Sequence, residues 1–469
     1  MLILVLESST TSAKAMLYCS DKGVLDVRTR AFTGLPADPA TQDAQEIFRQ
    51  LAALGREACL ERSIDMIALS ATWHSVLLCD RDMVPQTPVY LWSFTGAGDL
   101  CRRLREDGDY VSRFYRRTGC MVNASYPFFK LKYLREQGWQ LENYLIMGQG
   151  TYNTYRLTGE RIIMDSMASG TGLMNIHSRE YDAQILSEIG IHPGQLSRIV
   201  TYKDTARLSE DGAKCLGLSP GIPVIAAGPD GGLNQVGVPD GVMTFSAGTS
   251  GALRMSIPRP MTDSYTGTWC YLSPKSWISG AATSGCCNCV DWARDRFFGA
   301  GTPYAEIEKN FGPPERTPVF LPFLFGERCP GWQDDRQAAF LDIKPFHTAH
   351  DMYHSVLEGT LYNLYQCFLQ LAELNGHPRR ILLSGGILHS AYWTQMCADI
   401  FGTDMEAADF EHGSMTGAAI LALELMGVIK DASNFSLSST RRIAFDPAMH
   451  EQYARKFQRY VTLYENNRN

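Results

Sequence analysis

The sequence lacks an apolar run long enough to cross a bilayer, and it begins without an export signal. The first segment, MLILVLESS, is apolar only as far as Leu6 and reaches Glu7 without a preceding Lys or Arg. The chain of 469 residues contains 13 cysteines, which without such a signal indicates reduced thiols. We therefore expect a soluble cytoplasmic protein with no membrane partner.

The sequence also lacks a surplus of positive charge and the common nucleotide-binding signatures. Its 43 Lys and Arg residues stand against 50 Asp and Glu, so the net charge of −7 provides no basic surface for nucleic acid. Neither Gly-x-x-x-x-Gly-Lys-Ser/Thr nor Gly-x-Gly-x-x-Gly after a strand is present. Any nucleotide site must therefore be built from shorter turns.

The length predicts two domains, because a single hydrophobic core stops growing well below 469 residues. Short apolar runs alternate with helical patterns, which predicts an α/β fold with mixed sheets flanked by helices. The expected strands are 2–6, 15–18, 66–70, 77–79, 89–92, 224–227, 242–245, 252–255, 277–282 and 381–383. The expected helices are 44–60, 100–106, 128–136, 290–298, 352–373, 392–401 and 415–426. A Gly/Pro-rich linker at 237–241 places the boundary between domains 1–238 and 239–469.

Two strand–turn–strand units about half a chain apart follow the same plan. In the first the turn is Ser8-Ser9-Thr10-Thr11-Ser12, and in the second it is Gly248-Thr249-Ser250. Such turns offer backbone N–H groups and hydroxyls to phosphate oxygens. The repetition predicts two domains of similar build, each with a phosphate-contacting turn. Ordinary tight turns favour the same residue types, so the turns alone leave both interpretations open.

A carboxylate lies among glycines at the end of an apolar run. Residues 224–227 are followed by Gly228-Pro229-Asp230-Gly231-Gly232. A carboxylate at the end of a strand can accept the proton of a hydroxyl that attacks a phosphate. Beside a phosphate-contacting turn, this arrangement suits phosphoryl transfer.

Two other turns offer contacts to a nucleotide and to a sugar. Ser384-Gly385-Gly386 follows a strand and allows close approach of the backbone to a ligand, although a plain strand-to-helix turn is equally compatible. Trp73-His74 also follows a strand. The aromatic ring can cover the C–H face of a carbohydrate while the imidazole bonds a hydroxyl, but a packed tryptophan beside an exposed histidine fits the pattern as well.

Two clusters resemble metal sites without completing one. Cys286-Cys287-Asn288-Cys289 has no second cysteine pair, so we expect small buried thiols there and no zinc. His347, His350 and His354 have helical spacing, but no carboxylate pattern accompanies them, and we expect a solvated helix face.

These segments, in this order, resemble the FGGY family of carbohydrate kinases, within the actin/hexokinase/Hsp70 ATPase superfamily. The resemblance covers nearly the whole chain and is strongest to the gluconate kinase and xylulokinase branch. Besides the turns above, the segments that carry it are 119–131, 155–159, 168–173, Leu321-Pro322-Phe323, Gly326-Glu327-Arg328, Pro330-Gly331-Trp332, Gln395 with Ala398 and Asp399, and Gly417-Ala418-Ala419.

The resemblance implies two RNase-H-like (actin-like ATPase) domains with the active site in the cleft between them, ATP and Mg²⁺ as cofactors, and a small sugar or sugar acid as substrate. It implies that Asp230 is the general base and that Glu7 holds Mg²⁺ through water. The implied ATP contacts are Thr10, Thr11, Ser12, Lys14, Gly248, Thr249, Ser250, Gly385, Gly386 and Ser390. The implied substrate contacts are Trp73, His74, Ser125, Tyr126, Asp230 and Gly231. A homodimer is the family's common assembly.

The sequence departs from the family pattern at three places. Glu7-Ser8-Ser9 stands where Asp-x-Gly is usual, Ser93-Phe94-Thr95-Gly96 replaces Asp-x-Arg after Trp92, and Cys286-Cys287 stands where glycines approach the nucleotide. A shift near 1 Å at such a site can cost about a hundredfold in rate. We expect an active kinase with gluconate as the first substrate. The alternatives are a ketopentose kinase similar to xylulokinase and a sugar- or nucleotide-binding regulator that has lost activity.

Overall fold

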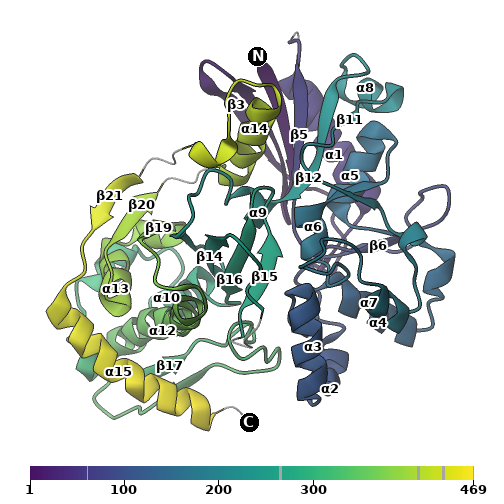
Figure 1. Cartoon of the computed structure of the whole chain (residues 1–469). Helices are drawn as coiled ribbons and strands as arrows, with labels where there is room; N and C mark the ends of the chain where they lie inside the picture. Colours follow the sequence, from purple (N-terminus) through teal and green to yellow (C-terminus); the bar gives the residue numbers. More distant parts are fainter. Residues whose placement is uncertain (61, 263–266, 409–411, 436–438, 468–469) are drawn as a thin grey trace.

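The protein consists of two lobes, each built around a mixed β-sheet, in a computed structural model (Figure 1). The structure describes residues 1–469 except 61, 263–266, 409–411, 436–438 and 468–469. The predicted α/β architecture with two domains of similar build is confirmed. No helix among the described residues is long and apolar enough to span a membrane.

The sheet of the first lobe has six strands in the order β11-β12-β5-β1-β2-β3. Its centre is parallel, because β12, β5 and β1 run in one direction, whereas β1, β2 and β3 form an antiparallel meander. The bounds are β1 Leu2–Ser8, β2 Ser12–Cys19, β3 Gly23–Ala31, β5 Met66–Ala71, β11 Ala206–Arg207 and β12 Pro223–Pro229.

The sheet of the second lobe has seven strands in the order β15-β16-β14-β13-β19-β20-β21. Here β13, β19 and β20 are parallel, and β13, β14 and β16 form the antiparallel meander. The bounds are β13 Val242–Ala247, β14 Gly251–Ile257, β15 Trp269–Leu272, β16 Trp277–Ala282, β19 Arg380–Ser384, β20 Met405–Ala408 and β21 Ser439–Ile443.

The two sheets repeat one six-strand plan, so the same kind of loop recurs in each lobe. β1, β2, β3, β5, β12 and β11 correspond in order and direction to β13, β14, β16, β19, β20 and β21. The predicted turns therefore occupy equivalent positions, at the carboxyl ends of β1 and β13. In folds of this class, ligands bind beyond the carboxyl ends of parallel strands.

The helices cover these sheets with the apolar faces that their sequences provide. The long helices are α1 Ala44–Ala58, α3 Gly108–Thr118, α4 Pro127–Glu136, α5 Gln149–Thr158, α10 Cys287–Phe297, α12 Ala349–Asn375, α13 Ala391–Phe401, α14 Gly413–Leu425 and α15 Pro447–Asn466. The short ones are α2 Gly98–Arg105, α6 Asp165–Ser169, α7 Ala183–Glu188, α8 Glu210–Leu216, α9 Asp230–Leu233 and α11 Tyr304–Glu308. Minor strands are β4 Thr41–Gln42, β6 Leu77–Cys79, β7 Val89–Tyr90, β8 Leu145–Met147, β9 Ile162–Met164, β10 Arg198–Val200, β17 Val319–Leu321 and β18 Ala339–Leu341.

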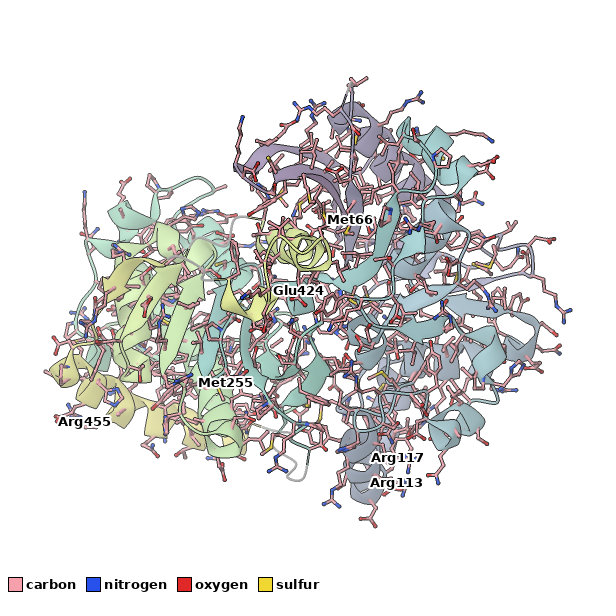
Figure 2. The ribbon with its side chains drawn as sticks, turned by 45° about the horizontal axis from the view of Figure 1, so that its top comes forward. Met66, Arg113, Arg117, Met255, Glu424 and Arg455 are labelled. Carbon is pink, nitrogen blue, oxygen red and sulfur yellow. The ribbon has the colours of Figure 1, made fainter. Side chains whose placement is uncertain are left out.

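Helix α14 joins the two lobes, although its sequence belongs to the second half of the chain. It packs against α9 and against strands β1 and β5 of the first lobe, beside the purple strands in Figure 1. Gly417 permits this contact, because a Cβ there would lie 2.1 Å from the Leu233 carbonyl oxygen. At the far end of α14, Glu424 accepts hydrogen bonds from Tyr202 of the first lobe and Lys275 of the second. Figure 2 shows Glu424 between Met66 of β5 and Met255 of β14.

Strand β15 fixes a second junction between the lobes. The Cys270 N–H donates to the Gly119 carbonyl across 2.9 Å, and the Leu272 N–H donates to the Ser169 hydroxyl across 2.9 Å. Gly119 has a φ of +69°, and a Cβ there would lie 1.9 Å from the Cys270 carbonyl oxygen. The end strand of the second sheet is thereby bound to the first lobe.

The expected solvated face of histidines is wrong for His354. Thr348 is the N-terminal cap of α12, so His347 precedes the helix and does not share a face with the others. His354 is fully buried, and its ring stacks on Phe311 at 4.4 Å. The helical spacing of the three histidines therefore did not reflect a shared solvated face, because one is a core residue and the other two are half-buried.

Candidate active site

Asp230 begins α9, directly after β12, at the carboxyl edge of the first sheet. Its side chain is half-buried, and the hydrogen bond the structure gives it comes from the N–H of Gly231, 2.7 Å away. Loss of solvation and the negative charge of Glu7 raise its pKa to about 6, against the opposing effects of that hydrogen bond, Arg254 and Lys14. A carboxylate with this pKa is ionised at neutral pH and a better proton acceptor than an ordinary aspartate.

Glu7 lies at the end of β1, opposite Lys14 on β2 and Ser70 on β5. Lys14 forms an ion pair with Oε1 at 2.8 Å, and the Ser70 hydroxyl donates to Oε2 at 2.8 Å. Ser414, in the first turn of α14, also donates to Oε2. The carboxylate is 2% exposed and therefore connects three elements of the first lobe with the helix that crosses from the second.

The turn after Glu7 is held in a fixed shape that leaves its tip open. The Ser9 N–H donates to the Ser12 carbonyl at 3.0 Å, and Trp92 donates through Nε1 to the Thr10 hydroxyl at 3.2 Å. Thr11 is exposed, and Thr10 and Ser12 are half-buried. Thr11 is thus free to contact a ligand, whereas Thr10 is already in contact with the loop that follows β7.

Trp73 and His74 follow β5 and line the interlobe junction. The Trp73 indole is buried, donates to the Ser166 and Met167 carbonyls, and packs on Tyr271 with ring centroids 4.9 Å apart. Gly231 lies against the same indole, because a Cβ there would be 3.3 Å from the ring. Trp73 therefore forms a wall directly beside Asp230.

His74 is neutral and presents one nitrogen as an acceptor. Its Nδ1 lies 2.6 Å from the Gly170 carbonyl oxygen, so Nδ1 must carry the proton and Nε2 the lone pair. Burial lowers its pKa to about 3. Lys130, which is fully buried, donates to the His74 carbonyl at 2.7 Å and supports a backbone with a φ of +64°. An acceptor nitrogen held in this way suits a sugar hydroxyl.

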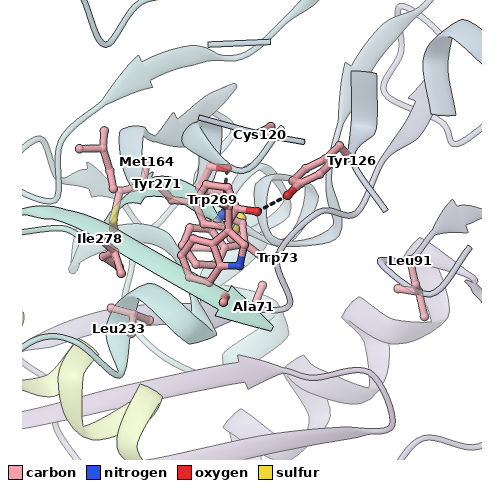
Figure 3. Packing of buried hydrophobic residues seen from close by; sticks show 14 of the residues in the cluster. Ala71, Trp73, Leu91, Cys120, Tyr126, Met164, Leu233, Trp269, Tyr271 and Ile278 are labelled. Atoms are coloured by element: carbon pink, nitrogen blue, oxygen red, sulfur yellow. Dashed lines mark hydrogen bonds between the residues drawn. The ribbon is translucent and has the colours of Figure 1, made fainter. Parts of the chain in front are cut away.

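Ser125 and Tyr126 lie on the other side of His74. The Ser125 hydroxyl is buried without a hydrogen-bond partner and lines a cleft of about 400 Å³. Tyr126 is fully buried, and its hydroxyl meets that of Tyr271 on β15, the contact drawn as a dashed line in Figure 3. Ser125 therefore faces the cleft, and Tyr126 lies one layer behind it.

The cleft runs between the lobes and includes the loop that departs from the family pattern. Ser93, Phe94 and Thr95 line it from the first lobe, and Thr249 and Ser250 from the second. The Phe94 ring packs on Tyr90 at 4.7 Å and on Tyr133 at 5.7 Å. Aromatic packing thus fixes the loop after Trp92, at the position where the family pattern has an Asp and an Arg.

In the second lobe, the turn at 248–250 and the turn at 384–386 lie next to each other. Thr249 is exposed, Gly248 and Ser250 are half-buried, and the Gly248 carbonyl accepts from the Cys287 N–H at 2.9 Å. Gly385 has a φ of +96°, and a Cβ there would lie 2.5 Å from the Ala247 carbonyl oxygen. Only glycine fits at this position, so the two turns form one backbone cradle.

Ser390 and the cysteines border this cradle. The Ser390 hydroxyl caps α13 through the Trp393 N–H and donates to Glu308 at 2.6 Å, so it is fully engaged in local structure. Cys286 and Cys289 are buried, whereas Cys287 is half-buried with its Sγ next to Gly386. A Cβ at Gly386 would be 2.9 Å from that sulfur.

Two arginines, Arg254 and Arg328, were not predicted as site residues. Arg254 on β14 is half-buried, and its Nη1 donates to the Ser246 hydroxyl at 3.1 Å. Arg328 lines the cleft, and its Nε is buried without a partner. A charged residue within the apolar run of β14 is the signal that could have identified Arg254.

Glu327, next to Arg328, has a structural role. It is 1% exposed and accepts from Arg336 at 2.9 Å, from the Tyr464 hydroxyl at 2.6 Å and from the Gly331 N–H at 3.1 Å. These bonds tie the loop to α15. The Gly-Glu-Arg motif therefore combines a buried anchor with a side chain that faces the cleft.

The site residues fit a nucleotide better than they fit a resident metal. A Cβ at Gly385 would lie 2.5 Å from the Ala247 carbonyl oxygen and one at Gly386 would lie 2.9 Å from the Cys287 sulfur, whereas the side chains of Thr11 and Thr249 are exposed. Among the described residues, no group of three or more His, Cys, Asp or Glu side chains is arranged to hold a metal ion. Both oxygens of Glu7 already have protein partners.

Known proteins resemble this chain along nearly its full length. The model for the FGGY family of carbohydrate kinases, N-terminal domain, matches residues 2–237, and that for the C-terminal domain matches residues 243–425. The gluconokinase of Bacillus subtilis (strain 168) is 30% identical over 94% of this chain and 91% of its own. The xylulose kinase of Escherichia coli (strain K12) is 24% identical over 90% of this chain and 88% of its own.

Solved structures share the two-lobed fold. A ligand-bound xylulose kinase from Lactobacillus acidophilus has a TM-score of 0.93 at 23% identity and covers 99% of this chain and 98% of its own. A gluconate kinase from the same organism has a TM-score of 0.92 at 23% identity, with the same coverage.

Proposed function

This chain belongs to the FGGY family of carbohydrate kinases, and we propose that it transfers a phosphate from ATP to a hydroxyl of gluconate, with Asp230 as the general base. The choice of gluconate is supported by 30% identity to a gluconokinase, against 24% to a xylulose kinase. The observation that carries the mechanism is the Asp230 carboxylate, half-buried at the carboxyl end of β12 with a raised pKa.

The proposed roles follow from the surroundings of each residue. Asp230 accepts the proton of the attacking hydroxyl, and His74 accepts a hydrogen bond from another hydroxyl through Nε2. Trp73, Gly231 and Ser125 bound the sugar, while Tyr126 positions His74 from behind. Phosphoryl transfer depends mainly on such positioning, because it requires little covalent chemistry from the protein.

The nucleotide is proposed to lie against the turns of both lobes. Thr11, with Thr10 and Ser12 behind it, would contact phosphate oxygens from the first lobe. Gly248, Thr249 and Ser250 would do so from the second, and Gly385 and Gly386 would border the adenosine, with Ser390 holding α13 in place. Mg²⁺ bound with ATP would neutralise charge that develops on the phosphates.

Glu7 is proposed to act on Asp230 and on the lobe junction. Its charge raises the pKa of Asp230, and its bonds to Lys14 and Ser414 join β2 to α14. We also propose a water-mediated contact to Mg²⁺ at Oε1 of Glu7, which already accepts a hydrogen bond from Lys14. Lys14 would then balance the charge of Glu7 beside the phosphates.

We predict that kcat/KM falls about tenfold per pH unit below about pH 6, because protonated Asp230 cannot accept a proton. Since the pKa is raised, the active ionised form dominates above that pH and is lost as the pH falls. Glu7→Gln removes a charge that raises this pKa, so the acidic limb should move to lower pH. Measuring kcat/KM from about pH 4.5 to 8 for both proteins tests this.

His74 provides an internal control, because a group with a pKa of about 3 does not titrate in this range. An acidic limb that stays in place in Glu7→Gln would show that the titrating group is not Asp230 beside Glu7. A Mg²⁺ titration of the same variant separates the second role. A higher Mg²⁺ requirement with an unchanged gluconate KM supports water-mediated binding, and an unchanged requirement removes it.

The proposed substrate is tested by measuring ADP release over a panel of aldonates, ketopentoses, ketohexoses and polyols. We expect gluconate to give the highest kcat/KM. Preferred turnover of xylulose would replace gluconate with a ketopentose and leave the kinase assignment intact. Binding of ATP without turnover on any member of the panel would instead identify a regulator on the same fold.

A further inference from the structure

Arg254 lies next to Gly231 and the proposed base Asp230, and it forms no ion pair with a residue that the structure describes. Its Nε lies against Gly231, where a Cβ would be 3.4 Å away, and its Nη1 reaches Ser246. Asp230 attracts it without touching it.

Arg328, which lines the interlobe cleft, is a second cation that forms no ion pair within the described part of the chain. Its guanidinium carbon lies 5.9 Å from the centre of the Trp92 ring, and its Nε is buried without a hydrogen bond. The nearby acids are engaged elsewhere. Asp334 accepts from Arg105 at 3.3 Å and Asn123 at 2.7 Å, and Glu327 is bound to Arg336.

The two guanidinium groups are close enough to repel each other. Burial and the charge of Arg328 lower the pKa of Arg254, and both arginines act electrostatically on the same groups around Tyr271. Partly buried like charges are costly unless an anion lies between them or beside them. Arginine is suited to a planar anion because its fork of N–H groups matches a carboxylate.

We propose that Arg254 and Arg328 bind the carboxylate of an open-chain polyhydroxy acid and thereby select sugar acids over neutral sugars. The inference rests on the proposed function, because it assigns the chemical class of the acceptor at that site. Ser125, whose buried hydroxyl has no partner, lines the cleft with Arg328 and is a further donor to the same ligand.

The position of Arg254 favours the acceptor over the phosphates of ATP. Arg254 lies four residues beyond Ser250, which is roughly 13 Å along an extended strand from the phosphate-contacting turn. Its Nε instead touches Gly231, next to the proposed base and the Trp73 wall. The charge of Arg328 likewise acts electrostatically on His74, Tyr126 and Tyr271, which surround the proposed sugar site.

The test compares gluconate with glucitol, which has the same carbon chain and a hydroxymethyl group in place of the carboxylate. Arg254→Gln and Arg328→Gln should each raise the gluconate KM, and its dissociation constant measured by calorimetry without nucleotide, on the order of 10- to 100-fold. The KM for ATP should stay within about twofold, and binding of glucitol, which lacks the anion, should weaken far less than binding of gluconate. Arg259→Gln, at an exposed position just beyond β14, is the matched control and should behave as wild type.

The Lys variants test whether a loss of gluconate affinity in the Gln variants results from a loss of the fold. Arg254→Lys and Arg328→Lys keep the charge and should recover part of the gluconate affinity, with melting temperatures near that of wild type. The proposal is overturned if the Gln variants raise the KM for ATP and leave gluconate unaffected, or weaken gluconate and glucitol equally. It also fails if the wild-type protein binds glucitol as tightly as gluconate. Gluconate binding that depends on both arginines in a protein without turnover would contradict the kinase proposal alone.

Discussion

Asp230→Asn is expected to lower kcat about 10³-fold, in the middle of the range for a positioned general base. The amide has the same shape but cannot accept the proton of the attacking hydroxyl. Binding of ATP and of gluconate should be retained, because the hydrogen bond that the structure gives Asp230 comes from the Gly231 N–H and not from the turns of either lobe. Coupled detection of ADP measures the rate, and calorimetry measures both affinities.

The same variant should not be less stable than the wild type. Burial and Glu7 raise the pKa of Asp230, so its charge at neutral pH opposes folding. Removing that charge is expected to raise the melting temperature slightly, as often happens when a functional residue is neutralised. Asp240→Asn, an identical change at an exposed position in the linker, is the control for both measurements. A loss of less than tenfold in Asp230→Asn would mean that another group receives the proton.

Glu327→Ala is expected to lower the free energy of unfolding by about 3–5 kcal/mol, because it leaves Arg336 buried and unpaired. It also removes the acceptor for the Tyr464 hydroxyl and the Gly331 N–H. Urea denaturation with a common m-value measures the loss. Glu315→Ala, at an exposed position that has no such bonds to the described residues, should change stability by less than about 0.5 kcal/mol.

This result would separate the two charged residues of the Gly-Glu-Arg motif. Glu327 is bound to α15 and Arg336, so the variant should be destabilised with a gluconate KM close to normal at low temperature. A gluconate KM that rises as much as in Arg328→Gln would show that the loop cannot present Arg328 without its anchor. A stability loss below about 1 kcal/mol would contradict the anchoring role of Glu327.

The sequence supplied most of the central strands and helices, since their apolar periodicity reflects burial directly. The helix expected at 352–373 is Ala349–Asn375, and that at 392–401 is Ala391–Phe401. Helix α15 was not predicted, although Asp446 caps it and Tyr453, Phe457, Tyr460 and Tyr464 have helical spacing. Strand β3 was missed for a different reason, because its side chains are largely exposed and carry no apolar alternation.

The candidate site was only partly accessible to sequence reasoning. Asp230 and the turns at 248–250 and 385–386 could be identified because glycine and carboxylate patterns are local. The contact of Ser414 with Glu7 and the pairing of Tyr126 with Tyr271 could not, since each joins segments more than a hundred residues apart. The surroundings of Arg254 depend on strand register, which sets it between Thr244 and Gly280.

Helix α14 has a consequence for how this protein can be divided or recombined. A cut between residues 238 and 239 would separate the first sheet from the helix that covers β1 and β5, so the amino-terminal fragment would expose apolar strand residues. Chimeras that exchange halves between relatives at this point would pair the first sheet with a foreign α14. Keeping a native interface therefore requires that residues 413–425 be exchanged together with the first half, as one discontinuous unit.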